Sequence, residues 1–402
     1  MECGGRIAVK IEKTVFGGDG LARSDSGEVI FVPGLLPGET ALVEITAVKK
    51  NFLKAKVLKT GETSPERRPP ECPAFHRCPG CVYFHTTPEY ETELKQQQFR
   101  DFLAGAGFDP DCAAEPLLPG EPLGYRNKMV LHVHKDSGEC FIGYVGADNQ
   151  SVTPIGRCPL VTPEINEFFA GQLDDPGFRH SVHHRMKLTW RHTAHDGVKF
   201  FRNAPPRNAT WLREDTCIGE LSVPMGNFFQ VNRAGADQLL RLYCDLVKKG
   251  SYQCAIDLYC GAGLFSAAAA SAGVADIRGA EIEEDSITAA RYNLKKRGRE
   301  DAAFFAGDAE KIFDQLLENA PANTLLTVDP PRGGLSAGLS RKLRSLPQGM
   351  TLCYISCHPA TWARDAANLR RAGFGLQHAQ IINQFCRTAH FEIFSVFRRE
   401  ND

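Results

Sequence analysis

The cysteines of this sequence are candidates for two kinds of chemistry, nucleophilic catalysis and metal binding. Cys357 follows an apolar run, residues 352–356, and precedes His358 and Pro359. A thiol in this place is either a nucleophile that acts as its thiolate or a small core residue without a reactive role. Cys353, four residues earlier in the same run, has the features of a core thiol. The position alone leaves both interpretations of Cys357 open, so the surrounding elements must decide.

A second group of cysteines has the spacing of a metal site. The four candidate ligands are Cys72, Cys78, Cys81 and Cys158. The first three form a C-x5-C-x2-C pattern, and the fourth lies far downstream, where Cys112 and Cys140 are its competitors. Four soft thiolates suit either structural zinc or an iron–sulfur cluster. The sequence therefore predicts a metal centre and leaves its metal open.

The composition is that of an ordinary soluble protein with two or three domains. Hydrophobic residues make up 43% and charged residues 24% of 402 residues, and 14 cysteines are too few for a disulfide scaffold. The N-terminus lacks the apolar segment of a secretory signal, and no apolar run of about 18 residues predicts a membrane span. We therefore expect a cytoplasmic protein with no membrane association, and no obligate protein partner is evident.

Two basic stretches stand out in a chain whose net charge is −1. Residues 49–59 hold five lysines, and residues 179–207 hold seven lysines or arginines against one acid, Asp196. Such stretches are usually solvated faces, but two of them in a near-neutral chain also suit a polyanionic partner.

The N-terminal half is expected to consist mainly of short strands. Residues 1–62 alternate apolar and polar side chains between glycine turns, which indicates a small β-barrel of the kind that often holds single-stranded nucleic acid. A proline-rich linker, residues 64–73, follows. Residues 86–106 have the period of a helix, with Thr87 and Pro88 at its start. Residues 121–222 again predict short strands.

From residue 223 onward, strands alternate with helices, which predicts an α/β domain with a parallel sheet. The five expected parallel strands lie within residues 254–260, 276–282, 302–308, 323–331 and 349–357. Residues 378–385 and 391–399 are expected to add a terminal antiparallel pair.

The first of these strands ends in a glycine loop, AIDLYCGAGLFS. Gly261 and Gly263 allow close approach of a ligand, and Ser266 stands where a dinucleotide fingerprint has its third glycine. S-adenosylmethionine has no pyrophosphate and therefore suits this loop. Glu281, twenty residues beyond Gly261, is placed for the ribose hydroxyls, and Asp308 for the adenine edge. The alternative is that both acids only cap helices.

The fourth strand ends in DPPRGGL, with Arg332 where amino-group methyltransferases carry an aromatic residue. No cysteine lies in this loop, where cytosine-C5 methyltransferases typically carry one. Both features disfavour those reactions. Arg332 is free to contact a phosphate or a base, or to form a salt bridge.

Seven segments in the same order resemble the RNA 5-methyluridine methyltransferases. They are the GDGLA…VIFVPGLLPGE region, RRPPECPAFHRCPGC, FFQVN, DLYCGAGLF, DPPRGGL, YISCHPATWARD and HFEIFSVF. The resemblance implies a TRAM-like barrel, a small α+β central domain with a cysteine-ligated cluster, and a Rossmann-like class I methyltransferase domain. The implied boundaries are 1–62 for the barrel, 63–85 with 118–222 for the central domain, and 86–117 with 223–402 for the methyltransferase domain.

The resemblance also implies roles for individual residues. Cys357 would add to C6 of uracil, which activates C5 toward the methyl group, and Glu392 would then remove the C5 proton. Gln230, Tyr259 and Asp329 would contact S-adenosylmethionine. The cysteines would hold a [4Fe–4S] cluster that orders the central domain, although CPGC replaces the CGGC usual in the family.

We therefore expect an S-adenosylmethionine-dependent RNA uracil-C5 methyltransferase that acts on ribosomal or transfer RNA through a covalent adduct with Cys357. Three alternatives stay open. They are an RNA-binding protein without catalysis, an iron–sulfur oxidoreductase that binds a dinucleotide, and a methyltransferase acting on another base position.

Overall fold

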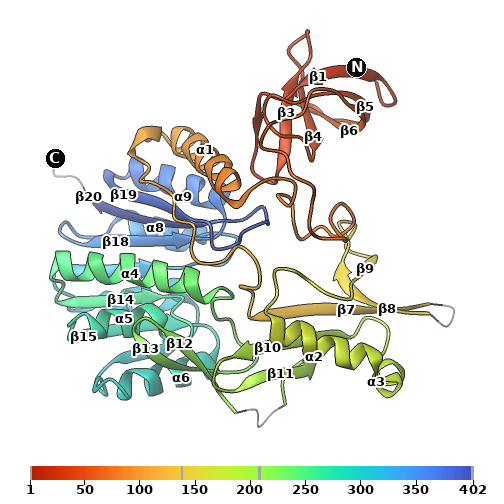
Figure 1. Cartoon of the computed structure of the whole chain (residues 1–402). Coiled ribbons are helices and arrows are strands. Elements are labelled where there is room, and N and C mark those ends of the chain that lie inside the picture. Colours follow the sequence, from red (N-terminus) through yellow and green to blue (C-terminus); the bar gives the residue numbers. More distant parts are fainter. Residues whose placement is uncertain (1, 137–138, 207–209, 400–402) are drawn as a thin grey trace.

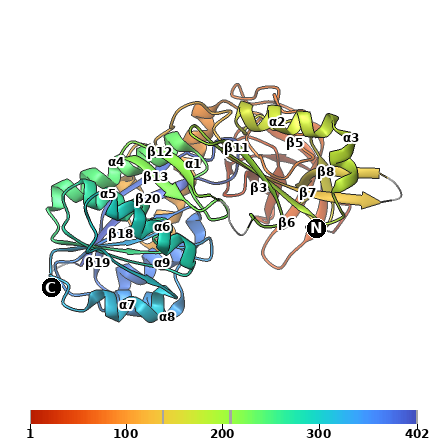
Figure 2. The same cartoon turned by 90° about the horizontal axis from the view of Figure 1, so that it is seen from below.

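The chain folds into three parts, described here by a computed structural model that covers residues 2–136, 139–206 and 210–399. These are an N-terminal barrel, a central β-rich part and a larger α/β part (Figure 1). The barrel and the central part lie on the same side of the α/β part in two perpendicular views (Figure 1 and Figure 2). No helix within these described ranges is both long and apolar enough to cross a membrane.

The barrel is one strongly curved sheet with the order β1-β5-β6-β4-β3-β2. Its strands are β1 (Arg6–Lys10), β2 (Lys13–Thr14), β3 (Asp19–Arg23), β4 (Val29–Pro33), β5 (Thr40–Val48) and β6 (Leu53–Thr60). Alternate side chains of β5 and β6 are buried, because successive residues of a strand point to opposite faces. The expected small β-barrel is confirmed.

The central part is a five-stranded sheet in the described residues, with the order β11-β10-β7-β8-β9. Its strands are β7 (Lys128–Asp136), β8 (Glu139–Val145), β9 (Val152–Pro154), β10 (Lys187–Thr193) and β11 (Gly197–Arg202). Two helices, α2 (Pro163–Asp174) and α3 (Pro176–Ser181), join this sheet. The residue pattern of 121–222 predicts strands only, whereas the α+β central domain implied by the resemblance includes helices. The buried pair Ile165 and Phe169, four residues apart on α2, was the available signal.

The α/β part contains the expected parallel sheet. Its strands are β14 (Cys254–Leu258), β15 (Asp276–Glu281), β16 (Ala303–Ala306), β17 (Thr324–Val328), β18 (Thr351–Ser356), β19 (Phe374–Ile382) and β20 (Glu392–Arg399). The order is β16-β15-β14-β17-β18-β20-β19, in which β14–β18 are parallel. The last strand, β20, inserts between β18 and β19 and is antiparallel to both, so the expected terminal pair is confirmed.

The helices of this part are α4 (Arg233–Gly250), α5 (Leu264–Ser271), α6 (Glu284–Lys295), α7 (Ala309–Leu317), α8 (Ala337–Arg344) and α9 (Pro359–Arg371). Helix α1 (Pro88–Ala106) packs with them although it precedes the central part in the sequence. Thr87 caps α1, and the Phe99 ring packs 5.2 Å from the Trp362 ring of α9. A short 3-10 helix, η1 (Pro110–Cys112), follows α1. Residues 88–106 thus form the expected helix, with Thr87 as its cap.

A hairpin connects the central and α/β parts. It consists of β12 (Leu212–Thr216) and β13 (Gly219–Val223). Leu221 belongs to the core of the α/β part, whereas Leu212 packs with Phe201 of the central sheet. A domain boundary near residue 222 therefore stays a prediction.

Candidate active site

The glycine loop after β14 has a backbone that glycine adopts readily. Gly261 has φ 53° and Gly263, at the start of α5, has φ 85°. A Cβ at Gly263 would lie 3.1 Å from the Cβ of Ala290 on α6, so the loop also needs a small residue there. The loop lies at the carboxyl end of a central strand, where open parallel sheets bind their ligands.

Glu281 and Asp308 lie at the same edge of the sheet but differ in their contacts. Glu281 accepts hydrogen bonds from the Gly261 and Ile282 amides at 3.1 and 2.7 Å, so it supports the glycine loop. Asp308 caps α7 by accepting a bond from the Glu310 amide at 2.8 Å. Capping therefore describes Asp308 and does not describe Glu281. With these hydrogen bonds, both carboxylates still lie at the edge of the sheet.

Cys357 and Glu392 lie opposite each other at this edge. Ser356, the last residue of β18, pairs with Ile393 of β20. Cys357 directly follows β18, and Glu392 is the first residue of β20, so continuation of this register sets the two opposite each other. Cys357 is half-buried, whereas Cys353 is fully buried in the core. The strand register thus sets a partly accessible thiol beside a buried carboxyl group.

Negative charge and burial dominate the electrostatics of this edge. Burial and the charges of Glu392 and Asp329 raise the pKa of the Cys357 thiol to about 12, and Arg332 opposes the shift. Burial and the charge of Asp329 also raise the pKa of Glu392 well above its usual range. Burial and the neighbouring carboxylates therefore disfavour the charged forms of both groups.

Two further polar side chains near this edge were not singled out by the sequence analysis. Asp257, inside β14, accepts bonds from the Ser266 amide and hydroxyl at 3.0 and 2.7 Å, and burial raises its pKa to about 7. Its charge contributes to a raised pKa of Asp329. Gln384 donates from Nε2 to Glu392 Oε2 at 2.6 Å. The sequence signal for Asp257 was a single acid inside an otherwise apolar strand.

The cofactor residues expected from the resemblance also lie in this region. Tyr259 begins the glycine loop with φ 64°, and burial with the charge of Asp308 raises its pKa to about 12. Gln230 is buried, and its Oε1 accepts a bond from Gln384 Nε2 at 3.3 Å.

The barrel reaches this edge through one aromatic side chain. Phe16 lies in the turn between β2 and β3, and its ring centroid is 5.3 Å from that of His358 and 6.0 Å from that of His390. His358 follows the candidate nucleophile directly, and His390 lies two residues before Glu392. The barrel therefore packs against both segments that carry the candidate catalytic pair.

The four candidate metal ligands line one small cavity of the central part. Cys72, Cys78, Cys81 and Cys158 face it together with Tyr144 and two arginines, Arg126 and Arg157. Neither Cys112 nor Cys140 lines this cavity, so the placement favours Cys158 as the fourth ligand. Across the described ranges, no group of three or more His, Cys, Asp or Glu side chains has an arrangement that could hold a metal ion.

The basic stretches differ from one another. In β6, Lys54 and Lys56 are exposed, although Lys56 pairs with Glu44 at 2.7 Å. In the second stretch, Arg191 is buried and pairs with Glu214 at 2.8 Å, so this arginine is structural. Arg207, the end of that stretch, lies outside the described residues. Arg332 is exposed, and none of the ion pairs among the described residues includes it, so this part of the chain gives no support to the salt-bridge alternative.

The Rossmann-like sheet carries a glycine loop and two acids at its edge. A thiol and a buried carboxyl group lie beside them. Together these features are those of a methyltransferase. Residues 2–58 match the family model of the TRAM domain, and residues 221–400 match that of tRNA (uracil-5-)-methyltransferases. The α/β part is thus similar to the tRNA (uracil-5-)-methyltransferases, and the N-terminal barrel is similar to the TRAM domain.

Individual relatives extend over nearly the whole chain. A 23S rRNA (uracil(1939)-C(5))-methyltransferase RlmD of Shewanella sp. is 28% identical, over 98% of this chain and 95% of the relative. An uncharacterised RNA methyltransferase of Gloeobacter violaceus is also 28% identical, over 98% and 97%. The fold is similar to that of the Pyrococcus abyssi tRNA (uracil-54, C5)-methyltransferase solved with S-adenosyl-L-homocysteine. That similarity has a TM-score of 0.73, 21% identity and coverage of 97% and 100%.

Proposed function

We propose that this chain transfers a methyl group from S-adenosylmethionine to C5 of a uridine in RNA, through a covalent bond between Cys357 and C6. The observation that carries the proposal is the strand register that sets Cys357 opposite Glu392 beside the glycine loop. If Cys357 were only a core thiol, its packing would not explain a buried carboxyl group opposite it.

The reaction requires two groups of the chain. The Cys357 thiol loses its proton to solvent, and its sulfur bonds to C6 while the C5–C6 double bond opens toward C5. The electron pair at C5 takes the methyl group, and the donor leaves as the thioether. Glu392 then accepts the C5 proton, the C5–C6 double bond forms again, and the bond between C6 and the Cys357 sulfur breaks.

The methyl donor fits the residues at the sheet edge. The proposed contacts are Gln230, Tyr259, Gly261, Gly263, Glu281, Asp308 and Asp329. S-adenosylmethionine supplies the methyl group and the positive charge of its sulfonium. Because Asp329 and Glu392 raise the pKa of Cys357, a cation beside them favours the thiolate. The acidic edge is thus suited to a cationic donor.

The RNA would approach from the side on which the barrel and the central part lie. Phe228 is 70% exposed, so its ring is free to stack on a base, while Phe229 packs against the core. Exposed Arg332 is available to a phosphate. We propose ribosomal or transfer RNA in the cytoplasm as the substrate, with the target uridine flipped out of its stack.

The test uses RNA in which uridine is replaced by 5-fluorouridine, because fluorine at C5 cannot leave as a proton. The enzyme is incubated with S-adenosylmethionine and either ribosomal or transfer RNA. We expect a complex that survives denaturation, with at least one RNA class. No complex with either class would overturn the mechanism and would favour the interpretation as an RNA-binding protein without catalysis.

Replacement of Glu392 by glutamine should separate the two halves of the reaction. The Glu392→Gln variant keeps the shape of the side chain but cannot accept the C5 proton. We expect it to form the methylated adduct on ordinary RNA and to release it about 10²- to 10⁴-fold more slowly. Gel analysis of trapped RNA and release of tritium from C5 measure the two steps. Wild-type tritium release would show that the base is another group.

We further propose that the cysteine cavity holds a [4Fe–4S] cluster, with zinc as the alternative. What supports the proposal is that four thiols from two distant segments line one cavity. A cluster in this cavity would tie the segment of residues 72–81 to Cys158 and so order the central part, because methyl transfer itself is redox-neutral.

Metal analysis of the protein purified without oxygen distinguishes the two metals. We expect about four iron and four sulfide per chain for a [4Fe–4S] cluster. Cys81→Ser should lose both, whereas the control Cys140→Ser should keep them. Zinc without sulfide in the wild-type protein would refute the cluster.

A further inference from the structure

Gln384 lies between the candidate base and the candidate cofactor contact. Its side chain is fully buried, and its Nε2 donates to Glu392 Oε2 at 2.6 Å and to Gln230 Oε1 at 3.3 Å. In the described residues, this is the single hydrogen bond from a donor to the Glu392 carboxyl group. One amide thus contacts two side chains of the site.

The orientation of the Gln384 amide follows from its surroundings. Both groups that face Nε2 present oxygens, so the opposite orientation would set oxygen against oxygen. The other end of the amide, Oε1, is buried without a hydrogen-bond partner and packs on Gly235 of α4. A Cβ at Gly235 would come within 2.4 Å of this oxygen. Gly235 therefore provides the space that lets the amide donor reach Glu392.

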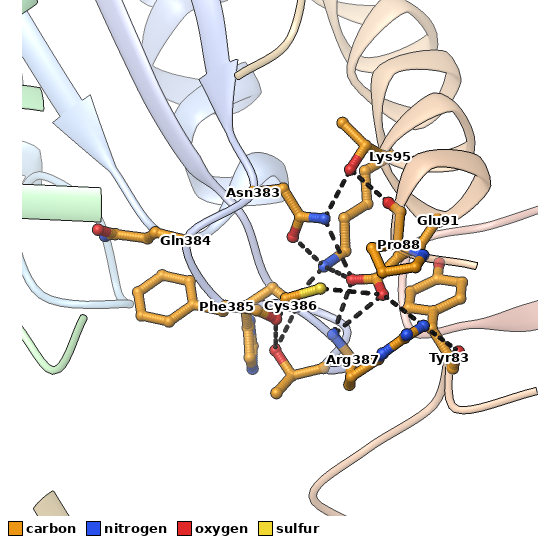
Figure 3. Close-up of polar contacts among 12 residues, drawn as sticks. Tyr83, Pro88, Glu91, Lys95, Asn383, Gln384, Phe385, Cys386 and Arg387 are labelled. Atoms are coloured by element: carbon orange, nitrogen blue, oxygen red, sulfur yellow. Dashed lines mark hydrogen bonds and ion pairs between the residues drawn. The ribbon is translucent and has the colours of Figure 1, made fainter. Parts of the chain in front are cut away.

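The loop that carries Gln384 is fixed on both sides. Asn232, the cap of α4, donates from Nδ2 to the Gln384 carbonyl at 2.8 Å. On the other side, Lys95 of α1 donates to Asn383 Oδ1 at 2.7 Å. Gln384 points away from the polar cluster around Lys95 (Figure 3), so its amide is left for the active site.

We propose that Gln384 is a positioning residue that orients the Glu392 carboxylate for removal of the C5 proton and connects it to Gln230. This inference rests on the proposed role of Glu392. A hydrogen bond from an amide to a carboxylate holds its rotamer and stabilises the ionised form, which is the form that accepts a proton. Loss of the donor should impair proton removal and leave addition of Cys357 to C6 intact.

The test compares wild-type protein with Gln384→Met, which is similar in size and cannot donate. With 5-fluorouridine RNA, which needs no proton removal to be trapped, Gln384→Met should form the adduct at the wild-type rate. With ordinary RNA labelled with tritium at C5, we expect tritium release about 10-fold slower at neutral pH. The rate of tritium release should rise with pH, and the midpoint of this rise should lie about one pH unit higher in Gln384→Met. The reason is that the variant loses a hydrogen bond to the Glu392 carboxylate.

Two further variants make the result decisive. Gly235→Ala keeps Gln384 but crowds its amide, and it should show the same alkaline shift. Gln380→Met removes a buried glutamine that bonds the Glu115 carbonyl outside the site, and it should leave the pH profile unchanged. If wild-type protein forms the adduct and Gln384→Met keeps the wild-type profile, the inference is wrong. Absence of the adduct in wild-type protein would instead overturn the proposed function.

Discussion

Cys357→Ala should lose methyl transfer by about 10⁴-fold or more, because removal of a nucleophile removes the covalent route altogether. The side chain is half-buried at the end of β18, so its loss leaves only a small defect in packing. We therefore expect a folded protein that yields no denaturation-resistant complex with 5-fluorouridine RNA. Transfer of a labelled methyl group to RNA measures the loss.

Cys353→Ala provides the matched control. Cys353 lies on the same strand, four residues earlier, and is fully buried. Its truncation should cost about 1 kcal/mol of stability through a small cavity, with methyl transfer retained. Equal loss of activity in both variants would indicate damage to the strand and not removal of a nucleophile. Substantial methyl transfer by Cys357→Ala would show that the reaction needs no covalent step.

The α/β part could be predicted from the sequence because its signals are local. Each parallel strand is a short apolar run, and glycines with acids follow at fixed distances, so strands and edge residues such as Glu281 appear without knowledge of contacts. The placement of Cys357 opposite Glu392 could not be predicted from local signals. It depends on insertion of β20 beside β18, which the sequence pattern leaves open and the family resemblance only implies.

Contacts between distant segments escaped the sequence analysis for a physical reason. Phe16 packs beside His358 and His390 across more than 340 residues of chain, and no period or motif encodes such a contact. Gln384 is one polar residue in a loop, and its role depends on the space that Gly235 leaves. The residue pattern did not indicate helix α2, because strand-like runs surround it on both sides.

Helix α1 holds the loop before Glu392 through a buried ionic cluster (Figure 3). Glu91 and Lys95, both fully buried, pair at 2.7 Å. Glu91 also accepts bonds from the Arg387 amide at 2.8 and 3.0 Å and lies 3.7 Å from the Arg387 guanidinium. Lys95 and Arg387 thus share one carboxylate as their counter-charge. The cluster connects α1 to residues 383–388, nearly 300 residues away in the sequence.

Glu91→Ala should therefore destabilise the C-terminal strands strongly. Removal of the shared carboxylate leaves two buried cations without a counter-charge, which costs about 3–5 kcal/mol. Hydrogen exchange of the β19 and β20 amides, measured under native conditions, reports the free energy of opening. We expect that free energy to fall by this amount, and tritium release from C5 to fall with it because Gln384 and Glu392 lose their support.

Glu93→Ala is the matched control, since Glu93 is an exposed acid on the same helix, and its loss should change the opening energy by less than about 0.5 kcal/mol. The two variants remove the same charge and the same side-chain atoms, so any difference between them belongs to the buried cluster. Similar protection of β19 and β20 in both variants would mean that Lys95 and Arg387 find other partners. The position of the base would then depend on the hydrogen bonds of Gln384 and Asn232 and not on α1.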